Sequence, residues 1–370
     1  MGLFRRKKPT SAPAAEPSAH EGPPLPPPPP PGPKSISLGL QGGGSHGAFE
    51  WGVLDRLLEE PELKIEAISA ASAGAMNAVV TAAGLAEDGP RGAKAKLDQF
   101  WRAVNQAGGR NVFGDSAIWT AAFNPRWLQA NPFYRYFEGM MASASPYEFN
   151  PFNLNPLGEV LAETVDFAAV RSAPVKLFIS ATDVIEGKAR IFSSHELSAQ
   201  VVLASSTLPL LFQAVEIHGR PYWDGGYVAN PPLWPLFGLD TPGDVLIVML
   251  NPMRRAELPK TAGEITDRLN EISFNAALAG ELKSVAMIQQ LAEEGLLTEA
   301  GVARFQRLMI HAIEADGHLD DLSLESKFDT EWGFLTDLKA RGRKAAEQWL
   351  HHHLAEVGVR SSFDIRSRFS

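Results

Sequence analysis

Three short motifs in this chain carry residue types that acyl-transfer chemistry requires. One is a glycine-rich loop, one is a serine among small residues, Ala70-Ala71-Ser72-Ala73-Gly74, and one is an acid followed by two glycines, Asp224-Gly225-Gly226. A serine can supply a nucleophile and a carboxylate can supply its base. Backbone amides that converge on one point can stabilise the oxyanion that forms during attack.

The glycine-rich loop reads Gly42-Gly43-Gly44-Ser45-His46-Gly47, between an expected strand at 35–40 and an expected helix at 48–59. Successive glycines let backbone N–H groups converge, and the following helix adds the positive end of its dipole. The loop also satisfies the dinucleotide fingerprint G-x-G-x-x-G. That fingerprint needs an acid for the ribose at the end of the second strand, where this chain has Ala70, Ala71 and Ser72. We therefore disfavour a dinucleotide site.

Ser72 follows an expected strand at 65–68 and precedes an expected helix at 75–85. This is the setting of a nucleophile elbow, a tight turn in which the residues two before and two after the serine must be small. Ala70 and Gly74 meet that requirement. The alternative is that Ser72 only caps the helix. For Asp224 the corresponding alternative is an ordinary β-turn with a turn-favoured aspartate.

The order of the expected elements indicates the fold class. Strands and helices alternate after residue 34, which predicts an α/β domain with a mainly parallel sheet. Because ligand sites gather at the carboxyl ends of such strands, the glycine-rich loop and Ser72 should face the same edge. A formal net charge of -9 argues against a nucleic-acid partner, and the lack of cysteine excludes disulfides and thiolate metal sites.

Three parts are expected along the chain: a basic, proline-rich, disordered tail at 1–33, a catalytic domain at 34–255, and a helical extension at 256–370 packed on it. The proline run at 26–31 predicts an extended spacer. The cluster Arg5-Arg6-Lys7-Lys8 fits either peripheral contact with anionic lipid or a solubilising tail, and we prefer the second. No apolar run is long enough to span a bilayer, and no secretory signal is recognisable. We expect a cytoplasmic location, with peripheral membrane contact as the alternative.

Two further segments carry expectations of their own. Residues 107–154 are rich in aromatic residues and proline. They fit equally well a cap that lines an acyl pocket and ordinary core from short helices. From 261 to about 355 the pattern is mostly helical, with amphipathic stretches at 265–282, 285–291 and 302–313.

Taken together, the three motifs resemble those of the patatin-like phospholipase family over roughly residues 35–235. A middle block, Ala204-Ser205 with Pro209 and Phe212, adds to the resemblance. The resemblance implies a three-layer α/β/α fold and lipid acyl hydrolysis by a dyad of Ser72 and Asp224, with no metal or cofactor. It also implies an oxyanion hole in the glycine-rich loop and supporting roles for Ala70, Gly74, Gly225 and Gly226. Two positions depart from the pattern: Ala70 stands where glycine is usual, and His46 where many members have arginine.

The dyad implies that Ser72 attacks an ester, that an acyl-enzyme forms, and that water releases the acid. The rival mechanism is a Ser-His-Asp triad that uses His46, His195 or His218. We disfavour it because none of these lies in a late strand-end loop, where α/β-hydrolases keep their histidine. The expected partner is a lipid or ester substrate. Two other functions stay open: a short-chain or intracellular polyester esterase, and an inactive lipid-binding scaffold.

Overall fold

The computed structural model describes residues 32–109, 145–238, 241–255, 257–305, 308–322 and 324–369. Pro33–Ser370 form one compact unit. The tail expected at 1–33 lies almost wholly outside the described residues, as does most of the aromatic segment at 107–154. The domain boundary expected at residue 255 stays a prediction.

Eight strands of the described chain form one sheet in the order β5-β6-β3-β2-β1-β7-β8, with β4 also paired to β3. Their bounds are β1 (Lys34–Leu40), β2 (Leu63–Ala70), β3 (Lys176–Asp183), β4 (Lys188–Ser193), β5 (Val215–Ile217), β6 (Arg220–Asp224), β7 (Asp244–Met249) and β8 (Met309–Glu314). Five neighbouring strands run parallel: β3, β2, β1, β7 and β8. The pairings of β4, β5 and β6 are antiparallel. The mainly parallel sheet predicted from the sequence is confirmed.

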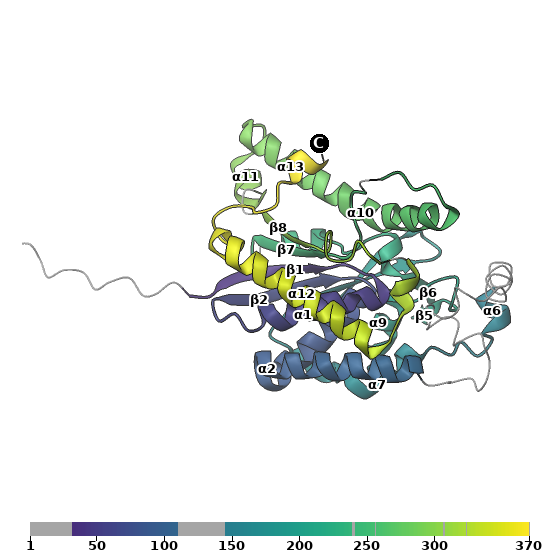
Figure 1. Ribbon diagram of the computed structural model, residues 1–370. Helices are drawn as coiled ribbons and strands as arrows, with labels where there is room; N and C mark the ends of the chain where they lie inside the picture. Colours follow the sequence, from purple (N-terminus) through teal and green to yellow (C-terminus); the bar gives the residue numbers. More distant parts are fainter. Residues whose placement is uncertain are drawn as a thin grey trace, which may run out of the picture. The chain divides into compact units, whose positions relative to one another are not determined.

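Helices surround this sheet (Figure 1). Their bounds are α1 (Gly47–Leu57), α2 (Ala73–Gly109), α6 (Pro146–Phe149), α7 (Pro156–Thr164), α8 (Phe167–Ser172), α9 (Ala199–Ser205), α10 (Ala262–Glu293), α11 (Glu299–Phe305), α12 (Trp332–His353) and α13 (Ile365–Phe369). Short 3-10 turns are η1 (Gly44–His46), η2 (Ser194–Glu196), η3 (Gly225–Tyr227), η4 (Trp234–Phe237), η5 (Leu324–Phe328) and η6 (Leu354–Glu356). Inside α2 the backbone is non-helical at Asp88 and Gly89, so this element consists of two helices that meet at a kink.

The side chains of β7 alternate between two hydrophobic cores on opposite faces of the sheet. Leu246 and Val248 pack in the core that contains α1, α2 and α12, while Val245 and Ile247 pack in the core that contains α10. Figure 1 shows α10 and α13 on one side of the sheet and α1, α2 and α12 on the other. All six residues of β7 are buried, as expected for a strand covered on both faces. The predicted three-layer α/β/α fold is confirmed.

The amphipathic helix expected at 302–313 is wrong in its second half. Helix α11 ends at Phe305, and β8 then pairs in parallel with β7 at the edge of the sheet. Ile310 and Ile313 are buried in it. Periodicity alone cannot distinguish a short apolar strand from a segment of buried helix. The C-terminal part therefore adds a strand to the sheet as well as helices. No described helix is long and apolar enough to cross a lipid bilayer.

Candidate active site

Ser72 occupies the turn between the end of β2 at Ala70 and the start of α2 at Ala73. Its φ is 53°, in the left-handed region that is costly for a residue with a side chain. Its backbone N–H donates a hydrogen bond of 3.0 Å to Oγ of Ser205. The turn has the strained strand-to-helix geometry of a nucleophile elbow. It also places Ser72 at the N-terminus of α2, where the helix dipole favours negative charge.

The glycine-rich loop lies directly against Ser72. A Cβ atom on Gly42 would come within 2.6 Å of the Ser72 Cβ, so the close approach requires glycine. The Gly42 N–H donates to Oδ1 of Asn230 at 2.6 Å. Before the loop, Oε1 of Gln41 accepts from the backbone N–H groups of Leu250 and Asn251, at 2.7 and 2.9 Å. These side-chain amides hold the loop at the carboxyl ends of β1 and β7.

Backbone amides of the loop fall into two groups. The His46 N–H donates to the Gly43 carbonyl at 3.2 Å, and the Gly47 N–H donates to the Gly44 carbonyl. No described residue accepts a hydrogen bond from the N–H groups of Gly43, Gly44 or Ser45. Those three residues, and not Gly42, His46 or Gly47, line the cavity at Ser72. The loop therefore offers three free amides near the serine.

Asp224 ends β6 and is fully buried. Its Oδ1 accepts from the Gly226 N–H at 2.7 Å, and its Oδ2 has no hydrogen-bond partner among the described residues. Burial raises the pKa of Asp224 to about 6, although the hydroxyl of Ser72, the amide of Gly226 and the charge of Lys327 act to lower it. A carboxylate that titrates near neutrality is suited to general-base work.

Ser72 and Asp224 are neighbours that are not yet hydrogen-bonded. The Ser72 hydroxyl is close enough to influence the pKa of Asp224, yet Oδ2 lacks a partner with ordinary hydrogen-bond geometry. Hydrogen bonds between a nucleophile and its base often tighten only when substrate binds.

A cavity of about 350 Å³ joins the three motifs. Gly43, Gly44, Ser45, Ser72 and Asp224 all line it. Most of its wall is apolar and comes from Met76, Phe100, Trp101, Val104, Leu157, Leu208, Leu210, Leu211, Phe212, Tyr227 and Phe274. Its size and apolar lining are typical of a site for a hydrophobic ligand.

Of the other residues predicted for the site, Ala70 is the last residue of β2 and Gly74 lies in the first turn of α2. Gly225 and Gly226 form η3 directly after Asp224. All four are next to a proposed catalytic side chain, but none of them lines the cavity.

The histidines considered for a triad do not line this cavity. The ring of His46 shares a hydrogen bond of 2.7 Å with Oγ of Ser326. Burial and the charge of Lys327 lower the pKa of His46 to about 3, so its ring is neutral. His195 bonds the Ser193 hydroxyl, and His218 is exposed. No histidine of the described ranges lines the cavity that holds Ser72.

A different Ser-His-Asp arrangement lies near the start of β7, at the end of that strand opposite the cavity. The ring of His311 shares hydrogen bonds with Oγ of Ser362, at 2.8 Å from Nδ1, and with Oδ1 of Asp244, at 3.0 Å from Nε2. Asp244 begins β7, whereas the cavity lies beyond the other end of that strand, roughly 20 Å away at about 3.3 Å per residue. His311 is fully buried, and none of the three residues lines the cavity. We interpret this cluster as structural.

The C-terminal part brings residues to the cavity that no motif in the sequence indicated. Asn270 and Phe274 come from α10, and Lys327 comes from η5. Asn270 and Phe274 are four residues apart, so they share one face of the helix. That spacing is the only feature of the sequence that could have indicated these cavity residues, because Lys327 belongs to no recognisable motif.

The family model for patatin-like phospholipases matches residues 38–237, slightly more than half of the chain. Two solved structures are similar. The crystal structure of VipD from Legionella pneumophila is 15% identical, with 87% of this chain and 67% of that chain covered and a TM-score of 0.39. The crystal structure of full-length SpcU in complex with full-length ExoU, from the type III secretion system of Pseudomonas aeruginosa, is 15% identical, with 88% and 72% covered and a TM-score of 0.28. At these TM-scores neither likeness adds to the family match. No curated protein sequence matches the chain.

Proposed function

Because the chain belongs to the patatin-like phospholipase family, we propose that it is a lipid acyl hydrolase that works through a dyad of Ser72 and Asp224. The observation that carries this proposal is the shared cavity. The free amides of the glycine-rich loop, the strained serine and the buried carboxylate all line one mainly apolar space. An apolar wall suits the acyl chain of a lipid ester.

In the proposed first step, Ser72 Oγ attacks the carbonyl carbon of the ester and its proton passes to Oδ2 of Asp224. The carbonyl oxygen becomes an oxyanion, which the N–H groups of Gly43 and Gly44 stabilise. Each such donor contributes roughly 3–4 kcal/mol to the transition state. The tetrahedral intermediate collapses, Asp224 returns the proton to the leaving alcohol, and the acyl group stays on Ser72.

In the proposed second step, water attacks the acyl-enzyme. Asp224 accepts a proton from that water, the same amides stabilise the second oxyanion, and the free acid leaves as Ser72 recovers its proton. The pKa of Asp224, raised to about 6 by burial, supports both transfers because the group is ionised at neutral pH yet basic enough to accept a proton.

We also propose that the enzyme meets its substrate at a lipid surface. Leu210 and Tyr227 line the cavity and are 78% and 43% exposed. Large apolar side chains that line a cavity and are also exposed to solvent suit an interaction with an apolar surface. The cytoplasmic location expected from the sequence stays a prediction.

Labelling with a fluorophosphonate probe, followed by mass spectrometry, tests the dyad. The probe should modify Ser72 in the wild type and in Ser206→Ala, a matched control whose hydroxyl also belongs to a cavity residue. It should leave Ser72→Ala unlabelled and should react far more slowly with Asp224→Asn. A folded wild type that takes no label would indicate a lipid-binding scaffold instead.

A series of esters with increasing acyl length tests the substrate class. The apolar cavity predicts that kcat/KM rises with chain length. A flat profile or a preference for short chains would replace the lipid hydrolase with a short-chain or polyester esterase.

A further inference from the structure

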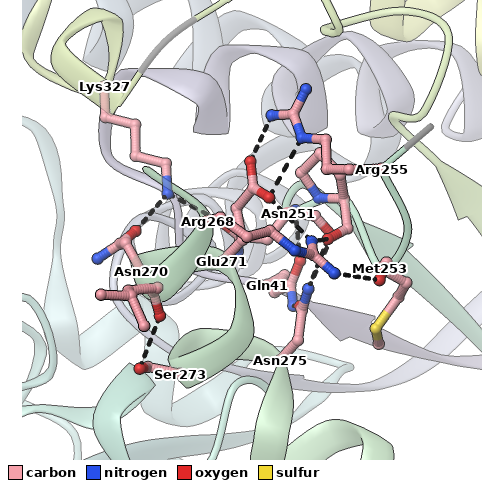
Figure 2. A network of polar contacts seen from close by, with 12 residues as sticks. Gln41, Asn251, Met253, Arg255, Arg268, Asn270, Glu271, Ser273, Asn275 and Lys327 are labelled. Atoms are coloured by element: carbon pink, nitrogen blue, oxygen red, sulfur yellow. Dashed lines mark hydrogen bonds and ion pairs between the residues drawn. The ribbon is translucent and has the colours of Figure 1, made fainter. Parts of the chain in front are cut away.

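Lys327 is a cation in the cavity that the proposed dyad does not use. It lies in η5 and lines the cavity together with Ser72 and Asp224. Its Nζ donates to Oδ1 of Asn251 at 2.8 Å and to Oδ1 of Asn270 at 3.1 Å (Figure 2). Both acceptors are neutral amides, and Lys327 forms no ion pair with any carboxylate in the part of the chain that the structure describes.

The ammonium group keeps its charge at neutral pH. Burial lowers the pKa of Lys327 to about 8, while the charges of Glu271, Asp267 and Asp224 act to raise it. An ammonium has three N–H donors, and the two asparagines occupy two of them. Charges in a partly desolvated cavity interact more strongly than in water. Its Nζ also lies 5.7 Å from the centroid of the Phe274 ring, a cation–π contact that involves no carboxylate. Lys327 therefore has both the charge and a remaining N–H donor for an anionic ligand.

The backbone of Lys327 packs against the oxyanion loop. Gly44 has a φ of 59°, and a Cβ atom there would come within 2.4 Å of the Lys327 carbonyl oxygen. Asn251, which holds the ammonium, also donates from Nδ2 to the Gly42 carbonyl at 3.1 Å. Figure 2 shows Asn251 within the same network as Gln41, which precedes the loop. The ammonium and the loop amides are thus fixed relative to one another.

Resting on the function proposed above, we propose that Lys327 is a specificity-determining residue that binds a phosphate group of the ester substrate. Only glycerol carbons separate the acyl ester from the phosphate in a glycerophospholipid. An ester held at Gly43 and Gly44 would therefore carry its phosphate near the adjacent ammonium. A neutral acylglycerol has no group that uses this charge. Lys327 selects phosphate-bearing lipids over neutral ones, and Asn251 and Asn270 position it.

Two substrates with the same acyl chain test this role: oleoyl lysophosphatidic acid and monoolein, both in neutral detergent micelles. Lys327→Gln should lose about 100-fold in kcat/KM on the phosphate lipid, mainly through KM, as expected for loss of a charged hydrogen bond. On monoolein the loss should be much smaller, limited to what the removed charge does to the pKa of Asp224. Lys327→Arg should retain most of the preference, because it keeps the charge. Lys283→Gln, which removes an exposed lysine of α10, should behave as the wild type.

Other outcomes overturn the proposal. Equal losses on both lipids in a folded Lys327→Gln variant would assign Lys327 to the reaction centre, and no loss on either would remove its role. Inhibition of the wild type by inorganic phosphate without discrimination between the two lipids would indicate a site for free phosphate. A wild type that hydrolyses neither lipid overturns this inference. Fluorophosphonate labelling of Ser72 then reports separately whether the proposed dyad also fails.

Discussion

The backbone N–H of Ser72 donates a hydrogen bond of 3.0 Å to the hydroxyl oxygen of Ser205, 133 residues further along the chain. Ser205 is the last residue of α9 and is fully buried. The elbow of Ser72 is strained, so it persists only where neighbouring structure holds it. We infer that α9 holds the nucleophile turn in place through this bond.

Ser205→Ala should therefore affect both stability and catalysis. It leaves a buried N–H without a partner, which should reduce the free energy of unfolding by about 1–2 kcal/mol. Without this bond the turn should position Ser72 less well. If the transition state is stabilised by about 1.4 kcal/mol less, kcat falls roughly tenfold. Urea denaturation and steady-state kinetics measure the two effects. The neighbouring Ser206→Ala should be close to neutral in both, since its hydroxyl bonds only backbone carbonyls of α9. Full activity in Ser205→Ala would rule out this positioning role.

The strain at Ser72 predicts an unusual gain in stability. A left-handed conformation costs a residue with a side chain about 1–2 kcal/mol, whereas glycine adopts it freely. Ser72→Gly should thus have a free energy of unfolding about 1 kcal/mol higher than that of Ser72→Ala. Urea denaturation measures this difference. Both variants lack the nucleophile and should be equally inactive. If Ser72→Gly were the less stable of the two, the turn would carry no such strain.

The motifs around Ser72 and Asp224 are predictable because each is local. A glycine run, small residues beside a serine, and an acid before two glycines can all be found within a few neighbouring positions. Alternation of strands and helices likewise predicts the layers of the fold. What these patterns predict is therefore the fold and the candidate nucleophile, base and oxyanion loop.

Lys327 could not be predicted in this way. It reaches the cavity because η5 packs on the oxyanion loop, and the His46–Ser326 hydrogen bond there joins residues 280 positions apart. No local pattern records such a contact. The wrong prediction at 302–313 has a related cause. β8 is a strand because it pairs with β7, and β7 lies far earlier in the chain.

The raised pKa of Asp224 predicts the acid limb of the activity profile. The proposed base must be ionised, and burial raises its pKa to about 6. Thus kcat/KM should be level above pH 7 and should fall about tenfold per pH unit below pH 6. Initial rates on a neutral ester from pH 4 to 8 would measure this limb. A midpoint near 4, the ordinary value for aspartate, would mean that Asp224 is solvated or is not the base.

The same burial predicts that Asp224 opposes folding when it is ionised. A folded-state pKa raised above the unfolded value favours folding at low pH, and this advantage is lost as pH rises through about 6. Ionisation should cost the folded state about 3 kcal/mol at pH 8. Asp224→Asn, inactive but isosteric, should accordingly be more stable than the wild type at pH 8. The difference should shrink toward pH 4, and urea denaturation at the two pH values measures it. Equal stability of the two proteins at pH 8 would contradict the prediction that the ionised, buried Asp224 destabilises the folded state.

The cluster of Ser362, His311 and Asp244 provides the last prediction, because its residue types imitate a catalytic triad. His311 bonds both partners, and Oδ1 of Asp244 also accepts from the Gly358 N–H at 2.8 Å. These bonds fasten the segment before α13 to the start of β7 and β8. We expect a structural role, so His311→Ala should lower the free energy of unfolding by about 2–4 kcal/mol, through two lost hydrogen bonds and the space left behind.

Ser362→Ala separates the structural role of this cluster from a catalytic one. It removes the would-be nucleophile but only one hydrogen bond, so it should cost about 1 kcal/mol of stability. Fluorophosphonate labelling and ester turnover should stay at wild-type levels in Ser362→Ala, while Ser72→Ala loses both. A loss of labelling in a folded Ser362→Ala variant would identify a second reactive serine. In that case the buried His311 would be its base, and the dyad would not be the sole source of hydrolysis.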